Sequence, residues 1–130
     1  MSGRRRALVV VQYAYAAVSL LAGIALTFAL GPVAQATNQT TARIVGAALL
    51  AMGVGALAAA RDPAGNRTML RVEIVFTVLS ALEIVRKLVD DQGGQGRTWL
   101  LLASLIVGSI VLAVLYPAAA ERQGSGVSRG

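Results

Sequence analysis

The sequence of 130 residues has no cysteine and no histidine, and aromatic residues make up only 5% of it. These absences exclude thiol redox chemistry, metal or haem sites that need cysteine or histidine ligands, and catalytic triads with a histidine base. Charged residues are also scarce, at 14% of the chain, against roughly 25% in an average soluble domain. We therefore expect no cofactor and no bound metal, and the scarcity of charge argues against a soluble domain.

Apolar residues make up 56% of the chain, and they gather in four long runs. About 20 apolar helical residues cross the roughly 30 Å hydrocarbon core of a bilayer. Residues 7–30 and 98–120 supply 24 and 23 uncharged residues, and residues 44–60 supply 17. These runs predict a small membrane protein with several spans.

The third run, residues 69–89, is long enough at 21 residues, but its uncharged centre, residues 74–82, has only nine. The charged residues of this run are Arg71, Glu73, Glu83, Arg86 and Lys87. We still predict that the run spans the membrane, because turn-forming segments bound it and neighbouring helices can shield its charges.

Short segments rich in glycine, proline and polar residues separate the four runs. Gly31-Pro32 is expected to end the first helix, Asp62 or Asn66 to cap the third, and Thr98 to cap the fourth. The sequence therefore predicts an all-α fold, an antiparallel four-helix transmembrane bundle. We expect one domain over residues 1–120, with helices at about residues 7–30, 42–60, 67–90 and 98–118, and a disordered cytoplasmic tail over residues 121–130.

The distribution of lysine and arginine predicts the orientation of the bundle. With four spans, the side that holds both termini carries eight of these residues and the other side carries four. Both termini are therefore expected in the cytoplasm, with the protein in a bacterial plasma membrane. The net charge of +6 makes membrane lipids, and not nucleic acid, the expected partners.

The alternative for the first run is a signal peptide, cleaved after the Ala34-Gln35-Ala36 motif. Its apolar stretch of 24 residues is much longer than the roughly 7–15 residues of such signals, so we favour a membrane span.

The third run also contains the residues best able to support chemistry. On a helical wheel of about 100° per residue, Glu73, Thr77, Ser80 and Glu83 form one polar stripe, which should face the interior of the bundle. Carboxylates inside a membrane are costly and often functional. One hypothesis is therefore that Glu73 and Glu83 form a proton relay or a cation-binding site.

The alternative hypothesis is that these carboxylates are structural. Glu83 precedes Arg86 and Lys87 by three and four residues, the favourable order for ion pairs on a helix. Glu73 can pair with a nearby arginine such as Arg71. We favour the structural hypothesis for both carboxylates, and a functional role is somewhat less favoured at Glu73 than at Glu83.

The first run has a weaker polar line at spacings of three or four residues: Gln12, Tyr15, Ser19, Gly23 and Thr27. Gln12 is placed to hydrogen-bond with Glu73, since both lie near the cytoplasmic face of the predicted bundle. We favour ordinary helix packing for this line, because small residues allow helices to approach closely.

The second run has small residues at a strict spacing of four: Ala47, Ala51, Gly55 and Ala59. This series predicts a close helix–helix contact, within the chain or between copies. We therefore expect that the protein can form a homo-oligomer or join a larger membrane complex.

Short motifs at residues 41–46, 61–63 and 85–88 resemble those of the uncharacterised DoxX-like small four-helix membrane proteins of bacteria. The resemblance covers about residues 41–117. It implies an antiparallel four-helix bundle, and it transfers no functional residue. Small multidrug transporters have a similar size, but their first helix has a glutamate where this chain has only Gln12.

The leading functional hypothesis is a non-enzymatic integral membrane protein of accessory or interaction type. The second hypothesis is a small proton- or cation-coupled transporter or channel that uses the carboxylates of the third helix. A lipid-modifying enzyme is a third hypothesis, supported only by the same two carboxylates.

Overall fold

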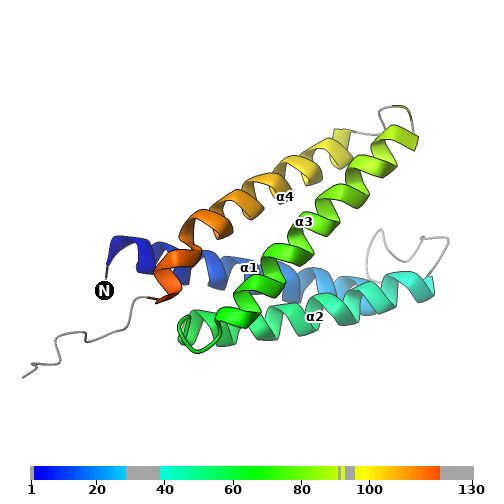
Figure 1. The fold of residues 1–130 in the computed structure, drawn as a ribbon. Helices are drawn as coiled ribbons and strands as arrows, with labels where there is room; N and C mark the ends of the chain where they lie inside the picture. Colours follow the sequence, from blue (N-terminus) through cyan, green and yellow to red (C-terminus); the bar gives the residue numbers. More distant parts are fainter. Residues whose placement is uncertain (1, 29–38, 91, 93–95, 121–130) are drawn as a thin grey trace, which may run out of the picture.

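The computed structural model describes residues 2–28, 39–90, 92 and 96–120. In this part of the chain four α-helices follow one another: α1 (Gly3–Thr27), α2 (Gln39–Arg61), α3 (Arg67–Asp90) and α4 (Gly96–Leu115). A short 3-10 helix, η2 (Tyr116–Ala120), extends α4, and successive helices run in opposite directions (Figure 1). The prediction of an all-α fold with four helices is confirmed, and no strand occurs in these residues.

Local interactions at the helix ends move two predicted boundaries. Helix α1 begins at Gly3, because the Ser2 hydroxyl accepts a hydrogen bond from the Arg5 backbone N–H at 3.2 Å and caps the helix. Helix α4 begins at Gly96, so Thr98 lies in its first turn and does not cap it. The α-helix ends before Pro117, since proline has no backbone N–H to continue it. Predictions for Gly31-Pro32, for the motif at residues 34–36 and for residues 121–130 lie outside the described residues.

The turn between α2 and α3 is held by side chains at its two ends. The Asp62 carboxylate accepts a hydrogen bond from Gly65 N–H at 3.1 Å. The Asn66 amide donates to the carbonyl oxygens of Ala58, at 3.3 Å, and Asp62, at 2.9 Å. Asn66 therefore stands immediately before α3 and also satisfies carbonyl groups at the end of α2.

Helices α1 and α2 form the tighter of the two hairpins, because glycines let their backbones meet. A Cβ atom added to Gly23 would lie 2.9 Å from the carbonyl oxygen of Gly46. The converse holds as well, since a Cβ on Gly46 would lie 2.9 Å from the carbonyl oxygen of Gly23. Small residues therefore bring these two helices together, as in other membrane helix pairs.

The small-residue series predicted on α2 lies one position away from this contact face and is divided between two environments. Ala47 and Ala51 are exposed, whereas Ala59 is completely buried in the core. Gly55 is half-buried, and a Cβ there would meet the end of the Met69 side chain on α3. Within this chain the series therefore contacts α3 and the core at its second half only, and a contact between copies through Ala47 and Ala51 stays a prediction.

All four helices meet at one end of the bundle. The core there consists of Leu8, Ala59, Leu70, Ala118 and Ala119, with Leu115 and Tyr116 packed against it. We call this the arginine end, because it carries Arg4, Arg5, Arg6, Arg61, Arg67 and Arg71.

Two of these arginines tie η2 and α4 to the rest of the bundle. Arg71 Nε donates a hydrogen bond to the Tyr116 hydroxyl at 2.6 Å, with the guanidinium 5.7 Å from the centre of the Tyr116 ring. Arg4 donates to the carbonyl oxygen of Val114 at 2.8 Å, which satisfies a free carbonyl at the end of α4.

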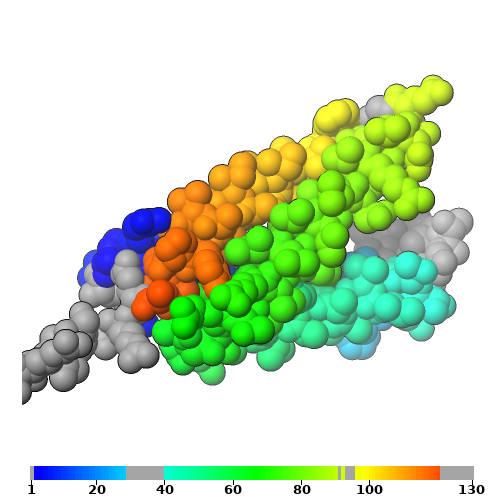
Figure 2. All heavy atoms as spheres, in the orientation of Figure 1, coloured from blue at the N-terminus to red at the C-terminus, as the bar shows by residue number. Residues whose placement is uncertain are grey.

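From the arginine end the α1–α2 hairpin and the α3–α4 hairpin diverge (Figure 1). Within each hairpin the two helices stay together, and Figure 2 shows α3 and α4 side by side along their length. The divergence leaves space between α1 and α4 in the middle of the protein.

Three described helices are long and apolar enough to cross a membrane: α1, α2 from Thr40 onward, and α4 with η2. These helices indicate a membrane protein. Helix α3 does not meet the same standard, in agreement with the high charge of its sequence. A fourth span by α3 therefore stays a prediction.

Candidate functional site

The structure divides the polar stripe predicted on α3. Glu73 and Thr77 are buried, at 0% and 4% exposure, while Ser80 is half-buried. The Glu83 side chain is 74% exposed. Only the first two of the four residues are therefore brought into the interior.

Glu83 is exposed and lies in the second half of α3, and α3 diverges from the α1–α2 hairpin toward its C-terminal end (Figure 1). Its carboxylate lies 3.8 Å from the guanidinium of Arg86, as the spacing of three residues favours. The expectation that Glu83 shares an interior stripe with Glu73 is thus not met. An ion pair with both side chains this exposed contributes little to stability.

Glu73 and Thr77 belong instead to a cluster with three residues of α1, which we call the α1–α3 polar cluster: Gln12, Tyr15, Ser19, Glu73 and Thr77. In the described part of the chain five polar or charged side chains are buried, and four of them lie in this cluster. The fifth is Arg5. The burial of polar groups in this protein is therefore concentrated between α1 and α3.

Gln12 and Glu73 form the centre of the cluster, and both are completely buried. The Gln12 amide lies close enough to the Glu73 carboxyl to interact with it. None of the four polar atoms at the ends of these side chains, however, completes a hydrogen bond of standard geometry within the described residues. Gln12 and Glu73 thus lie side by side, as their predicted positions near the cytoplasmic face allowed, but they form no well-formed hydrogen bond in the described residues.

Tyr15 and Thr77 close the cluster on the side of α4. The Tyr15 hydroxyl lies within hydrogen-bonding range of the Thr77 and Ser19 side chains. The Thr77 hydroxyl itself donates to the Glu73 carbonyl oxygen at 2.7 Å, one helical turn back. These contacts hold the Tyr15 ring beside the Gln12 and Glu73 side chains.

Two features of the sequence create this arrangement. Gln12, Tyr15 and Ser19 recur at three or four residues, as do Glu73 and Thr77, so each set lies on one helix face. In the part of the chain that is described, no Cα atoms of α1 and α3 come within 8 Å of each other. Only long side chains can therefore bridge the two helices.

The cluster is energetically unfavourable as it stands. A buried polar group left without a hydrogen bond costs about 1–3 kcal/mol, and a charged group costs more. The closest arginine on the same helix, Arg71, turns toward Tyr116. Groups of this kind in a protein interior are hypotheses for a functional site, because they persist against their cost.

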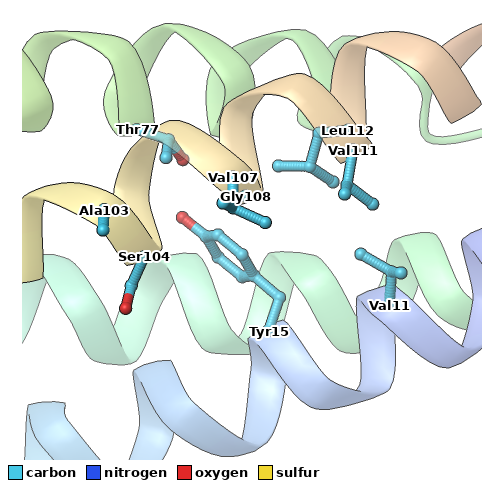
Figure 3. A pocket seen from close by; sticks show the side chains of 9 residues that line it. All are labelled: Val11, Tyr15, Thr77, Ala103, Ser104, Val107, Gly108, Val111 and Leu112. Atoms are coloured by element: carbon cyan, nitrogen blue, oxygen red, sulfur yellow. The ribbon is translucent and has the colours of Figure 1, made fainter. Parts of the chain in front are cut away.

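A cavity of about 500 Å³ adjoins the cluster between α1, α3 and α4. Its walls are formed by Val11, Tyr15, Thr77, Ala103, Ser104, Val107, Gly108, Val111 and Leu112 (Figure 3). Figure 3 shows the Tyr15 ring projecting from α1 toward α4, with its hydroxyl directed toward the Thr77 side of the cavity. Tyr15 and Thr77 therefore belong to both the cluster and the cavity.

The sequence pointed to part of this site. It placed Glu73 and Thr77 on one face of the third helix and Gln12 near the depth of Glu73, but it assigned the polar line of α1 to ordinary packing. The spacing of Gln12, Tyr15 and Ser19 was the available signal for a polar face that meets Glu73. The rest of that line behaves as expected for packing, since Gly23 contacts the α2 backbone.

In the described residues no three acidic, histidine or cysteine side chains gather in a way that could hold a metal ion. No protein-family model, curated protein or solved structure matches the chain. The resemblance to DoxX-like proteins stays a prediction from the sequence.

Proposed function

We propose that this chain is a small, non-enzymatic integral membrane protein that binds a proton or a cation at Glu73 and couples this binding to transport. The burial of Gln12 and Glu73 without completed hydrogen bonds, beside a cavity, is the observation that carries the proposal. It favours the transporter hypothesis over the accessory hypothesis. Glu83 takes no part, because it lies outside the bundle interior.

The proposal includes four spans, with the arginine end in the cytoplasm of a bacterial plasma membrane. Glu73 then lies six residues along α3 from Arg67, about 9 Å below the helix start at 1.5 Å per residue. At that depth a carboxylate needs neutralisation by a proton or a cation, because an isolated charge is costly in an apolar surrounding.

Gln12 can hydrogen-bond to both the ionised and the protonated form of the Glu73 carboxyl group. Its amide N–H can donate to the ionised carboxylate, and its carbonyl oxygen can accept from the protonated acid. A glutamine beside Glu73 thus stabilises both ends of a binding and release cycle. A fixed cation in this place would favour only the ionised form.

The test is ion flux through proteoliposomes that contain a pH-sensitive dye for protons or a potassium-sensitive dye for potassium. Imposed gradients of protons or of potassium should produce flux above that of empty liposomes. Glu73→Gln should abolish this flux, because the variant retains the shape of the side chain but can no longer ionise. Glu83→Gln is the matched control and should conduct as the native protein does. Flux that persists in Glu73→Gln, or the absence of flux in the native protein, would contradict the proposal.

A second candidate function is an accessory or interaction protein, and the exposed half of the small-residue series favours it. Ala47 and Ala51 lie one helical turn apart on the outer surface of α2. Such a pair permits close approach of another membrane helix, including one from a second copy. Native mass spectrometry of the detergent-solubilised protein tests this function. Association that Ala51→Leu removes would support it, and a monomer without co-purified protein would exclude it.

A further inference from the structure

We propose that the cation recognised at Glu73 is a hydrophobic organic cation, such as an aryl- or alkyl-substituted ammonium or phosphonium ion, which reaches the site through the cavity between α1 and α4. This inference rests on the proposed function and names its ligand class. It follows from the lining of the cavity, the acidic side chain of Glu73 next to it and the distribution of arginine.

The size and lining of the cavity favour a ligand whose uncharged part is apolar. Its volume of about 500 Å³ falls within the range of about 300–1,000 Å³ that is typical of small-molecule sites. Apolar residues of α1 and α4 form most of the wall. The two wall hydroxyls other than that of Tyr15 already donate to backbone carbonyls, Thr77 at 2.7 Å and Ser104 at 2.9 Å. The wall therefore has little to offer a hydrated inorganic ion, a sugar or an anion.

The charge of the site selects a cation. Glu73 is buried next to Tyr15, close enough for the two groups to interact electrostatically. The ring of Tyr15 lines the cavity itself (Figure 3). A cation over the face of this ring would be attracted to it, and an acidic group without a positive partner among the described residues lies close by.

The arginine end makes it unfavourable for a cation to enter from that end of the bundle. Six arginines stand there with Asp62 as the acidic residue of the adjoining turn. Their positive potential opposes the approach of a cation from that end of the bundle. The cavity opens between two apolar helices, so an amphiphilic cation dissolved in the bilayer can enter from the side.

Tyr15 controls the last step of this route. Glu73 has no exposed surface and is not part of the cavity wall, whereas Tyr15, which interacts with Glu73, is part of that wall. Direct contact between the carboxylate and the cation therefore requires the Tyr15 side chain to move away from Thr77 and Ser19. The ring would then flank the bound cation.

The experiment is equilibrium binding of radiolabelled tetraphenylphosphonium to the purified full-length protein in detergent, with binding to empty micelles subtracted. Tetraphenylborate has nearly the same shape and the opposite charge, so it measures apolar binding alone. We expect saturable binding of one phosphonium ion per chain and no saturable binding of the borate. Glu73→Gln should weaken phosphonium binding at least tenfold, and Glu83→Gln should leave it unchanged.

A second pair of variants tests the cavity without altering Glu73. Nothing lies within 4 Å of a Cβ added to Gly108, so Gly108→Leu should fold and place its side chain in the cavity. Its matched control is Ala113→Leu, at an exposed position of the same helix. Gly108→Leu should abolish phosphonium binding, and Ala113→Leu should preserve it.

The outcomes separate this inference from the proposed function. Equal binding of phosphonium and borate, or phosphonium binding unaffected by both Glu73→Gln and Gly108→Leu, would overturn the inference. If phosphonium does not bind but proton or potassium flux still depends on Glu73, the ligand class is wrong and the proposed function stands. If neither binding nor flux depends on Glu73, both fail.

Discussion

Replacement of Gly23 by alanine should destabilise the α1–α2 hairpin, because the added methyl group would meet the backbone of α2. The added Cβ would lie 2.9 Å from the Gly46 carbonyl oxygen and 2.9 Å from the Leu50 backbone nitrogen. Both are backbone atoms of α2, which cannot rotate away as the end of a side chain can. The two helices must therefore separate by several tenths of an ångström along their whole contact.

The expected magnitude follows from two opposing effects. Overpacking of a closely packed contact costs about 1–3 kcal/mol. Alanine is better than glycine inside a helix by about 0.5–1 kcal/mol. The net expectation for Gly23→Ala is a loss of unfolding free energy of about 0–2.5 kcal/mol, with the middle of the range at about 1 kcal/mol.

Two other glycines provide graded controls. A Cβ on Gly55 would meet the end of the Met69 side chain, which is flexible, so Gly55→Ala should cost less than Gly23→Ala. Nothing lies within 4 Å of a Cβ on Gly108, so Gly108→Ala should be neutral or stabilising by up to about 1 kcal/mol. The order of stability is therefore Gly108→Ala, then Gly55→Ala, then Gly23→Ala.

Because the chain has no cysteine, fluorescent labels can be placed cleanly for the measurement. Ala17→Cys on α1 and Ala48→Cys on α2 are exposed positions, and energy transfer between labels there reports separation of the hairpin as SDS is added to mixed micelles. Unfolding free energies of Gly23→Ala and Gly108→Ala that agree within about 0.5 kcal/mol would refute the packing argument.

Three further predictions concern other parts of the chain. Gln12→Leu replaces a buried, incompletely bonded amide by an apolar group, so thermal melts in detergent should show a gain of about 1 kcal/mol, while flux that depends on Glu73 should fall. Asn66→Ala removes the two hydrogen bonds to the end of α2 and should lower the unfolding free energy by about 1 kcal/mol, with no effect on flux. A topology reporter fused after Gly130 should give a cytoplasmic signal, and a periplasmic signal would contradict the four-span topology or its orientation.

The number and order of the helices could be predicted because they follow from local properties of the chain. Long apolar runs and turn-forming segments are visible without knowledge of the partners of each helix. The polar turn from Arg61 to Asn66 is an example, since its residues hydrogen-bond among themselves and to the end of α2. Ser2 is a residue type that caps helices, but the three arginines at positions 4–6 interrupt the apolar pattern from which the start of α1 was predicted.

The contact face of α2 could not be predicted in the same way. The series that includes Ala47 and Ala51 and the adjacent line through Gly46 and Gly53 both contain small residues at helical spacing. They differ by one position, or about 100° around the helix. The face that meets α1 is decided by the matching glycine on the partner, Gly23, and by the position of α3. Neither is a local property.

The same limit explains why two glutamates of α3 that look alike in sequence differ in the structure. Glu73 is six residues from Arg67, and Glu83 is seven from Asp90, so each lies about 9–11 Å from its own end of the helix. Depth along the helix therefore does not distinguish them. On the wheel they differ by only about 80°.

The two glutamates differ in the direction in which their side chains can extend and in how closely the α1–α2 hairpin covers them. The Glu83 side chain is exposed, so it can extend toward the end of the helix and pair with Arg86. Glu73 lies where Gln12 and Tyr15 of α1 cover it, and it has no surface through which to reach the interface or an arginine. A carboxyl group that can neither reach water nor find a fixed cation must obtain its neutralising charge from a mobile one. For this reason the functional hypothesis belongs to Glu73 alone, although the sequence offered both residues.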